Sequence, residues 1–374
     1  MAMTPPKRVA IFLSFSGDGG VEHMMLNLAG AIARQGIPVD LVRARAEGGH
    51  AHRVPEGVAV VDLGARHTWS SLPGLVRYLR REQPAALLAA KDRANRIALR
   101  ARRLAGVPTR VAVRLGNHLS RSLEGRSALH RWWRTAPMRR AYHRADAVIA
   151  VSAGVAEDTA AITGLSRQAI HVLPNPVVTP DLEEKARPEP EHSWLQARGE
   201  SDPPTLLAIG RLSRQKDFPT LLEAFARLCG QRPARLVVLG EGGDRAELEG
   251  LAARLGIADD VDFPGFVPNP YPHLRRADLF VLSSAWEGSP NALTEALALG
   301  TPVVATDCAS GPAEILEGGR YGPLAPVGDA AALAAAMART LDDPPTAEFL
   351  RRGADRYRDS ESARRYLEVL GVDI

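Results

Sequence analysis

The sequence predicts an α/β protein made of two Rossmann-like domains, each a doubly wound parallel sheet. Short apolar runs alternate with longer segments at helical spacing, and the same rhythm recurs in both halves of the chain. A length of 374 residues suffices for two domains at ~150 residues each. A polar, proline-bearing stretch without clear periodicity, residues 179–204, predicts the linker between them.

The first domain is expected over residues 1–178. An apolar run at 8–13, a helix at 22–35 with Met25, Leu28 and Ile32 on one face, and a second apolar run at 38–43 form a βαβ start. Such a start predicts a parallel sheet with helices on both faces. Further strands are expected at 57–63, 84–90, 109–115, 145–151 and 170–173, and further helices at 73–81, 95–104 and 154–163.

The second domain is expected over residues 205–357. Strands are predicted at 205–210, 235–239, 261–267, 279–282 and 302–305, and helices at 218–228, 244–255, 290–299, 330–341 and 346–357. For the helix near 291, Ser289 suits the N-cap, Pro290 the first helical position and Gly300 the position after the end. Asp329 is expected to cap the helix that begins at Ala330. A last helix at 362–370 lies in a C-terminal segment, 358–374.

Bulk composition favours a soluble globular protein of a reducing compartment. Hydrophobic residues make up 45% and charged residues 24% of the chain, which is ordinary for this class. Two cysteines, Cys229 and Cys308, give neither a disulfide framework nor metal-ligand spacing. We expect no secretion signal and no membrane span, because no stretch reaches ~20 apolar residues. The predicted location is cytoplasmic.

Positive charge is concentrated between residues 91 and 144, which contain fifteen Lys or Arg but two acidic residues, Asp92 and Glu124. This asymmetry predicts a polyanionic partner: nucleic acid, acidic lipid or a phosphorylated substrate. Trp132 and Trp133 lie among arginines of this segment, and this pattern favours a membrane interface. Two alternatives remain open: stacking on single-stranded nucleic acid, or a solvated helix whose tryptophans are core.

Two glycine-rich or polar loops follow strands of the first domain. Gly17 and Gly19 begin a dinucleotide-like pattern, but Glu22 stands where the third glycine would be, which argues against a Rossmann cofactor. His118 follows the strand 109–115, at the carboxyl end where open α/β sheets bind ligands. Arg114 and Asn117 are weaker candidates for the same site.

The stretch 278–307 carries the clearest chemical signal. It runs strand, loop, helix and strand, with Glu287 on the loop, Glu295 in the helix and seven residues between them. The N–H groups at the helix start make an anion site, and the two carboxylates can accept hydrogen bonds from hydroxyl groups. A sugar attached to a diphosphate matches this arrangement.

A second loop supplies positive charge. Arg211 and Lys216 follow the strand 205–210, where two fixed cations would neutralise a departing diphosphate. Gly240 opens a run of glycines that would let a nucleobase or phosphate approach the backbone. Asp260 and Asp262 form a D-x-D pattern, but their strand position argues against a metal role.

These motifs resemble retaining glycosyltransferases of the GT-B fold, in particular family 4. E-G-S-P-N-A-L-T-E is similar to the E-x7-E signature, Gly19-Gly20-Val21-Glu22 to the G-G-x-E loop, and G-R-L-x-x-x-K to the phosphate-binding loop of that family. The resemblance implies two domains facing a central cleft, with a C-terminal helix that crosses back to the first domain. It implies no metal and no cofactor.

The resemblance also assigns roles to residues. Catalysis falls to Glu287 and His118, without a covalent nucleophile. Donor-sugar contacts fall to Glu287, Gly288 and Ser289. The residues expected to bind the donor diphosphate are Arg211, Lys216, Gly19, Gly20, Asn291 and Ala292. Those expected to bind the nucleoside are Glu295, Gly240 and Val267.

The expected function is that of a retaining hexosyl- or N-acetylhexosaminyltransferase. A UDP-sugar is favoured over a GDP-sugar as donor. The expected acceptor is a saccharide or a polyprenyl-diphosphate-linked sugar, reached at the inner face of the cytoplasmic membrane through segment 91–144, and nucleic acid is not expected as a partner. The alternatives are a GT-B-like sugar-nucleotide epimerase and a basic nucleic-acid-binding protein.

Overall fold

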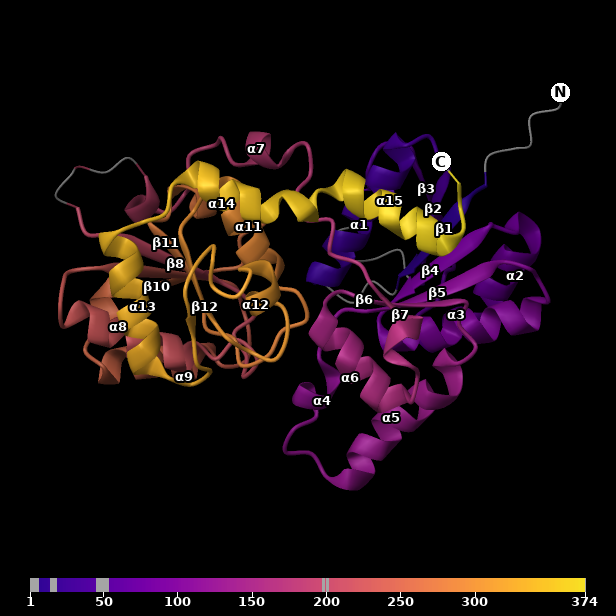
Figure 1. The fold of residues 1–374 in the computed structure, drawn as a ribbon, viewed down its shortest axis with the longest axis horizontal. Helices are drawn as coiled ribbons and strands as arrows, with labels where there is room; N and C mark the ends of the chain where they lie inside the picture. Colours follow the sequence, from indigo (N-terminus) through magenta and orange to yellow (C-terminus); the bar gives the residue numbers. More distant parts are fainter. Residues whose placement is uncertain (1–6, 14–18, 45–53, 197–198, 200–201, 374) are drawn as a thin grey trace. The chain divides into compact units, whose positions relative to one another are not determined.

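The computed structural model describes residues 7–13, 19–44, 54–196, 199 and 202–373. The chain forms two compact units, one of residues 1–177 and 357–374, the other of residues 178–356 (Figure 1). We call them unit 1 and unit 2. Each contains one wholly parallel sheet, so the predicted α/β class is confirmed.

Unit 1 contains a seven-stranded sheet of order β3-β2-β1-β4-β5-β6-β7. Its strands are β1 (Val9–Leu13), β2 (Val39–Arg43), β3 (Val58–Asp62), β4 (Ala86–Ala90), β5 (Arg110–Leu115), β6 (Ala147–Ala150) and β7 (Ile170–Val172). The central strands β1 and β4 are fully buried, which explains their continuous apolar runs.

Helices cover both faces of this sheet. They are α1 (Gly20–Arg34), α2 (Leu72–Glu82), α3 (Asp92–Ala105), α4 (Leu119–Ser122), α5 (Ala128–Tyr142), α6 (Ala153–Thr163) and α15 (Asp359–Leu370), with short 3₁₀ turns η1 (Thr68–Ser71) and η2 (Arg167–Ala169). Core residues of α2, α3, α5 and α6 pack with Phe12, Leu87 and Val113 of the sheet. Helices α1 and α15 contact each other, and α15 also contacts β4 and β5.

The C-terminal helix α15 is therefore part of unit 1. Tyr366 on α15 accepts a hydrogen bond from Nε of Arg114, at 3.0 Å, and Arg114 is also bonded to the side chain of Asn175. Arg114 is 1% exposed. The guanidinium of Arg114 thus holds α15 against β5. Arg114 therefore has a structural role, whereas the sequence suggested it as a weaker candidate for the binding site.

Unit 2 contains a six-stranded sheet of order β10-β9-β8-β11-β12-β13. Its strands are β8 (Thr205–Ile209), β9 (Arg235–Leu239), β10 (Val261–Gly265), β11 (Leu279–Leu282), β12 (Val303–Thr306) and β13 (Leu324–Ala325). Its helices are α7 (Leu182–Lys185), α8 (Phe218–Cys229), α9 (Arg245–Arg254), α10 (Tyr271–Arg276), α11 (Asn291–Leu299), α12 (Pro312–Ile315), α13 (Ala330–Asp342) and α14 (Ala347–Ala354), with 3₁₀ turns η3 (Ser193–Leu195), η4 (Ala258–Asp260) and η5 (Asp355–Tyr357). Helices α8, α9 and α13 pack with the sheet in one apolar core, and Asp329 caps α13 as predicted, accepting from the amide of Ala332 at 2.9 Å.

The stretch expected to be a linker, 179–204, belongs to unit 2. It contains α7 and η3, and it buries Leu182, Ala186 and Leu195. The sequence did not reveal these three buried apolar residues, because they are too widely spaced in a polar stretch to produce a helical or strand periodicity.

The loops after β8 and β9 pack so closely that a side chain cannot fit between them. Gly240 has φ +141°, and a β-carbon there would lie 2.0 Å from the carbonyl oxygen of Gly210. We expect Gly240→Ala to lower the free energy of unfolding by about 3 kcal/mol, through overpacking and backbone strain. Gly243→Ala, where a β-carbon meets nothing within 4 Å, is the matched control. Urea unfolding of the two variants would show equal stabilities if the close approach were unimportant.

No helix within the described residues is long and apolar enough to cross a membrane. Across the same residues no cluster of three or more His, Cys, Asp or Glu could hold a metal ion. Asp262 of the D-x-D pattern instead lies 2.9 Å from Nε2 of His192.

Candidate active site

The centre of the candidate site in unit 2 is an ion pair between Lys216 and Glu287. The Nζ atom of Lys216 lies 2.6 Å from Oε1 of Glu287, and the Ser284 hydroxyl donates to the same oxygen at 2.8 Å. The side chains of Lys216 and Glu287 are 18% and 9% exposed. Parallel strands place their carboxyl ends at one edge of a sheet, so the loops after β8 and β11 meet there. The two residues that the sequence selected on separate loops are thus brought together.

Hydrogen bonds to backbone groups hold these two loops together. The amide of Ala285 donates to the carbonyl of Gln215 at 2.9 Å, and Nε2 of Gln215 donates to the carbonyl of Trp286 at 3.0 Å. The Ser283 hydroxyl donates to the carbonyl of Lys216 at 2.8 Å. Asp217, next to Lys216, has the left-handed φ of 48° that few non-glycine residues adopt. Lys216 is therefore positioned by its surroundings before any ligand binds.

Ser310 fixes Glu287 from a third loop. Its hydroxyl donates to the carbonyl of Glu287 at 2.6 Å, from the loop after β12. Sequence reasoning selected neither Ser284 nor Ser310. The available signal was that Ser284 lies two residues after β11 and Ser310 four residues after the neighbouring strand β12.

Arg211 lies on the same loop as Lys216 but is exposed. Its guanidinium makes no hydrogen bond or ion pair with any residue that the structure describes. The structure thus separates the two predicted cations into a partly buried lysine that is already paired and a surface arginine that is not.

The helix that follows Glu287 begins one residue later than predicted. Pro290 is the N-cap, with extended φ −71° and ψ 107°, and Asn291 is the first helical residue. The assignment of Ser289 as N-cap and Pro290 as first helical residue is therefore wrong. The physical reason is packing: a β-carbon on Gly311 would lie 2.6 Å from Cδ of Pro290, so the loop after β12 presses against this segment and keeps it extended.

Four predicted residues surround this helix start. Gly288 and Ser289 lie on the loop before it, and Asn291 and Ala292 supply the first amides of α11. Amides of a first helical turn have no partner within their own helix, so they can bind an anion. Gly300 ends α11 in the left-handed conformation, as predicted.

Glu295 is buried inside α11. Burial raises the pKa of Glu295 to about 7, and the nearby Tyr271 hydroxyl, 3.5 Å from Oε1, opposes the rise by hydrogen bonding. The two glutamates therefore differ in environment: Glu287 is paired with a cation, and Glu295 faces a phenol. Tyr271 was not singled out by the sequence.

Gly240 and Val267 follow β9 and β10, the strands next to β8. The amide of Gly240 donates to the carbonyl of Gly265 at 2.8 Å, which ties the two strand ends together. Strand β10 ends at Gly265, two residues before the predicted end, and leaves Phe266 54% exposed beside Val267. Both predicted nucleoside residues thus lie at the same sheet edge as Lys216.

In unit 1, His118 lies just after β5, at the carboxyl edge of that sheet. Its Nδ1 is 3.4 Å from Oδ1 of Asp158, a buried carboxylate on α6 that also accepts from the amide of Leu119 at 2.7 Å. Asp158 therefore caps α4 and lies beside the His118 ring, a role that sequence reasoning missed. Asn117 is exposed, and its side chain accepts from the His118 amide.

Gly19 and Gly20 begin α1, as its N-cap and first residue. Gly17 lies outside the described residues. Glu22 is 1% exposed and pairs with Lys91, whose Nζ lies 2.5 Å from Oε1 of Glu22. Lys91 has an unusual φ of 76° directly after β4, so this pair sits at the same sheet edge as His118.

Two family models match the chain. The "Glycosyl transferases group 1" model matches residues 193–356 and the "Glycosyl transferase 4-like domain" model matches residues 19–176. The lipopolysaccharide core biosynthesis glycosyltransferase LpsE of Rhizobium meliloti is 29% identical over 88% of this chain and 87% of its own length.

Another relative is the N-acetylgalactosamine-N,N'-diacetylbacillosaminyl-diphospho-undecaprenol 4-alpha-N-acetylgalactosaminyltransferase of Campylobacter jejuni. It is 31% identical over 54% of this chain and 52% of its own length. Among solved structures, HepE of Anabaena in complex with UDP-glucose shares the fold, with a TM-score of 0.76, 19% identity, and coverage of 97% of this chain and 99% of its own.

These matches cover both units and agree with the motifs at the carboxyl edge of each sheet. They establish the GT-B fold, and both family models describe glycosyl transferases. The chain therefore belongs to the group 1 glycosyltransferases, family 4, and is related to enzymes of lipopolysaccharide and lipid-linked glycan assembly.

Proposed function

We propose that this glycosyltransferase moves a hexose or N-acetylhexosamine from a UDP-sugar to a saccharide acceptor with retention of the anomeric configuration. The observation that carries the proposal is the partly buried Lys216–Glu287 pair, on the loops after β8 and β11 and supported by Ser284 and Ser310. A paired lysine and carboxylate at a helix N-terminus suit a ligand with a diphosphate at one end and hydroxyl groups at the other.

The proposed roles follow from these environments. Lys216 and the exposed Arg211 neutralise the diphosphate as it leaves, and the amides of Asn291 and Ala292 add to that site. Glu287 accepts hydrogen bonds from the donor sugar, beside Gly288 and Ser289. Because the pair already exists without a ligand, the donor phosphate competes with Glu287 for Lys216 and frees the carboxylate for the sugar.

For unit 1 we propose His118 as a catalytic, sugar-facing residue, with Asp158 fixing its ring. The amides of Gly19 and Gly20, at the start of the fifteen-residue helix α1, are proposed as a further contact for the diphosphate. The support is their place at the carboxyl edge of the unit 1 sheet.

For the nucleoside we propose Glu295, Gly240 and Val267. The HepE structure contains UDP-glucose, which supports a uridine donor over a guanosine donor here. A carboxylate of Glu295 would accept hydrogen bonds from the ribose hydroxyls, whereas a protonated Glu295 would offer fewer acceptors.

UDP binding is expected to release a proton from Glu295. Its pKa is about 7 in the free protein, and ribose hydroxyls that bond to the carboxylate would lower it. UDP affinity should then fall by about tenfold per pH unit below pH 7 and level off above it. Calorimetric titration in buffers of different ionisation enthalpy measures the released proton.

Glu295→Gln should weaken UDP binding and remove both the pH dependence and the proton release. Glu223→Gln, an exposed carboxylate on α8, is the control. The same pKa sets a stability trend in the unliganded protein. The pKa of Glu295 is higher in the folded protein than in the unfolded chain. Its contribution to the free energy of unfolding therefore falls as pH rises from about 4.5 to 7. UDP binding that is independent of pH between 5 and 8 would contradict the assignment of Glu295.

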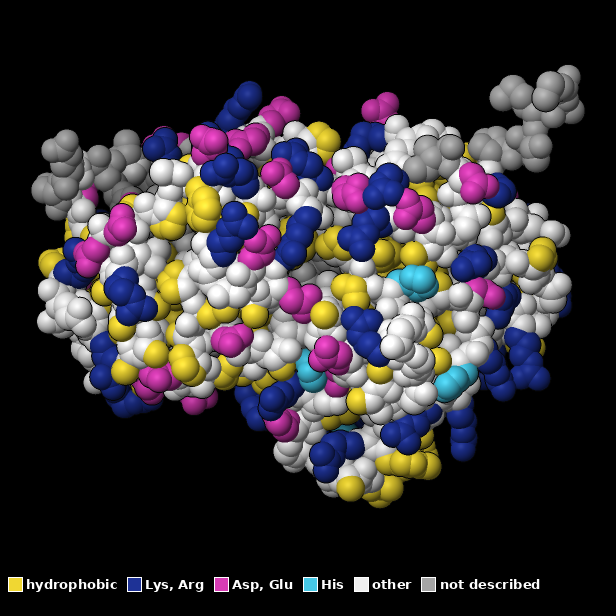
Figure 2. Space-filling model, viewed as in Figure 1, with side chains coloured by type: hydrophobic (Ala, Val, Ile, Leu, Met, Phe, Trp, Pro, Cys, Tyr) yellow, Lys and Arg dark blue, Asp and Glu magenta, His cyan; other side chains and the backbone are white. Residues whose placement is uncertain are grey.

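For the acceptor we propose a lipid-linked saccharide at an anionic membrane surface. The name of the Campylobacter relative specifies a diphospho-undecaprenol acceptor, and unit 1 carries a matching surface. Residues 124–134 are all exposed, with Leu129 66%, Trp132 56% and Trp133 68% exposed. Figure 2 shows hydrophobic and Lys or Arg side chains gathered over the tip of the α4–α5 region. The tryptophans are therefore surface residues, as membrane contact requires, which excludes the core alternative.

Arg131→Glu with Arg134→Glu is expected to weaken binding to phosphatidylglycerol vesicles, measured by co-sedimentation, by about thirtyfold or more, because each basic residue near an anionic surface contributes ~1 kcal/mol. Arg139 is left intact because its Nε donates to the carbonyl of Ile162 at 2.6 Å. Arg93→Glu with Arg100→Glu, two exposed positions on α3, is the control with the same charge change. Equal vesicle binding by both double variants would exclude α5 as the contact.

A further inference from the structure

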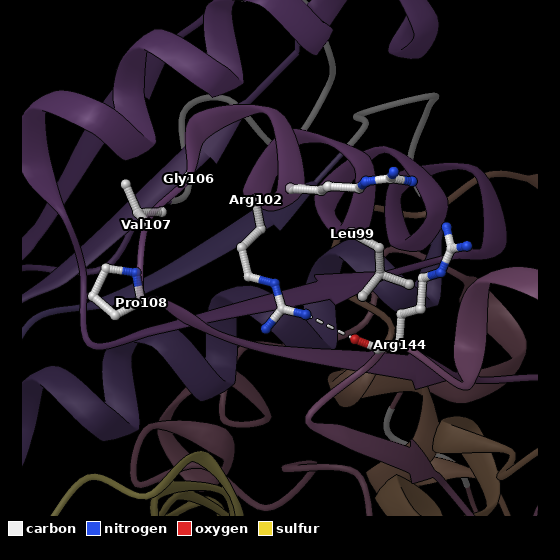
Figure 3. Close-up of a pocket in the computed structure, with 7 residues that line it drawn as sticks. Leu99, Arg102, Gly106, Val107, Pro108 and Arg144 are labelled. Carbon is white, nitrogen blue, oxygen red and sulfur yellow. Dashed lines mark hydrogen bonds between the residues drawn. The ribbon is translucent and has the colours of Figure 1, made fainter.

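A second basic feature of unit 1 lies away from the carboxyl edge of the sheet. A cavity of about 560 Å³ is lined by Leu99, Arg102, Arg103, Gly106, Val107, Pro108 and Arg144. These residues come from the end of α3, the loop into β5 and the turn before β6 (Figure 3). Helix ends and strand starts lie at the amino edge of a parallel sheet, whereas His118 and Lys91 follow the carboxyl ends of β5 and β4. The cavity is therefore separate from the candidate active site in unit 1.

Three arginines line the cavity, and the neighbouring Asp146 pairs with one of them. Arg102 lies 2.5 Å from Oδ2 of Asp146, and it also donates to the carbonyl of Arg144 at 2.8 Å, as Figure 3 shows. Asp146 accepts a further bond from the amide of Val111. Arg103 and Arg144 are exposed, and neither side chain makes an ion pair within the described chain. Two guanidinium groups are thus in surplus.

Arg103 is also not needed to neutralise the end of α3. The carbonyls of Leu104 and Ala105 there accept hydrogen bonds from Arg80, at 2.9 Å and 3.3 Å. Arg80 thus does the capping that a basic residue in a last helical turn often does. The Arg103 and Arg144 guanidinium groups remain available to a ligand.

The rest of the lining is apolar. Leu99 is 7% exposed, and Val107 and Pro108 continue the wall. The volume falls within the range of small-ligand pockets, ~300–1,000 Å³. Guanidinium groups match phosphate oxygens in geometry and charge, and the apolar wall suits a carbon chain or ring beside the phosphate.

We propose that this cavity is a binding site for a phosphate ester, held by Arg103 and Arg144 and flanked by Leu99, Val107 and Pro108. The phosphate can come from a free phosphate ester or from the headgroup of an anionic lipid. The site is independent of sugar transfer and of the vesicle contact proposed for α5, so its test uses binding alone.

The experiment is a calorimetric titration of the full chain with three soluble probes. They are inorganic phosphate, dihexanoyl-phosphatidylglycerol below its micelle concentration, and dihexanoyl-phosphatidylcholine as the zwitterionic comparison. Monomeric lipids avoid the bilayer contact of α5. Binding of phosphate and phosphatidylglycerol alike assigns a free phosphate ester, and binding of phosphatidylglycerol alone assigns a lipid headgroup.

Arg103→Gln with Arg144→Gln is expected to weaken this binding by roughly tenfold or more, because two charged hydrogen-bond donors are lost. Arg93→Gln with Arg100→Gln removes two exposed arginines from the same helix region and should leave it unchanged. The proposal is overturned if the wild-type chain binds neither anionic probe. Equal weakening in both double variants, or equal affinity for the zwitterionic lipid, would overturn it as well.

Discussion

Lys216→Ala is expected to lower kcat/KM for sugar transfer by about 10²–10³-fold. Removal of one preorganised group that stabilises developing charge has an effect of this size. The loop that carries the lysine is held in place by Ser283 and by the contacts of Gln215, so its charge is positioned before the donor binds. Initial rates of nucleotide release measure the effect.

The same change also leaves Glu287 without its cation in a mostly buried place. A buried carboxylate that loses its cation is destabilising, so some loss of stability follows. Urea unfolding measured beside activity separates this loss from the catalytic one. Arg227→Ala, an exposed cation on α8, is the matched control. A kcat/KM within threefold of wild type in a folded Lys216→Ala variant would refute the phosphate role.

Glu287→Gln is expected to lower kcat by about 10²-fold while leaving UDP affinity unchanged or higher. Glutamine preserves the shape of the side chain, and Ser284 can still donate to it. The charge that holds Lys216 is lost, however, so Lys216 becomes more available to phosphate. The expected signature is a fall in kcat without a rise in KM for the donor.

Glu223→Gln is the matched control for this variant, because it removes an exposed carboxylate from the same unit. A Glu287→Gln enzyme with wild-type kcat would remove Glu287 from the catalytic residues. Weakened UDP binding with unchanged kcat would instead move Glu287 from the sugar to the nucleotide.

The two-sheet architecture could be predicted because buried parallel strands appear in the sequence as apolar runs. The helices between them show apolar residues at helical spacing. The same logic brought Lys216 and Glu287 together, since both follow strands that end at one sheet edge. This part of the site follows from topology alone. It needs no knowledge of side-chain packing.

The parts that the sequence did not predict depend on tertiary contacts. Ser310 reaches the Glu287 carbonyl from another loop, and hydroxyl residues in loops carry no periodic signal. The start of α11 was misplaced because Gly311 packs against Pro290, a contact between segments about twenty residues apart. Trp132 and Trp133 are exposed because only a small part of α5 packs against the rest of the unit. The amino-acid composition does not show how much of a helix is packed.

The burial of Arg114 is a similar case. An arginine at the end of a strand suggested a ligand contact, but its partners are Tyr366 and Asn175 from distant parts of the chain. The C-terminal helix therefore decides the role of this residue. No local pattern near position 114 could have done so.

The most direct test of the proposed function is a donor panel assayed for acceptor-dependent nucleotide release. Purified protein is incubated with UDP- and GDP-linked hexoses and N-acetylhexosamines, with and without a lipid extract that supplies lipid-linked saccharides. We expect one UDP-sugar to release UDP when the extract is present, and the product to keep the anomeric configuration of the donor. Conversion of a nucleotide sugar without any acceptor would indicate the epimerase alternative, and release from no donor in the panel would contradict the proposal.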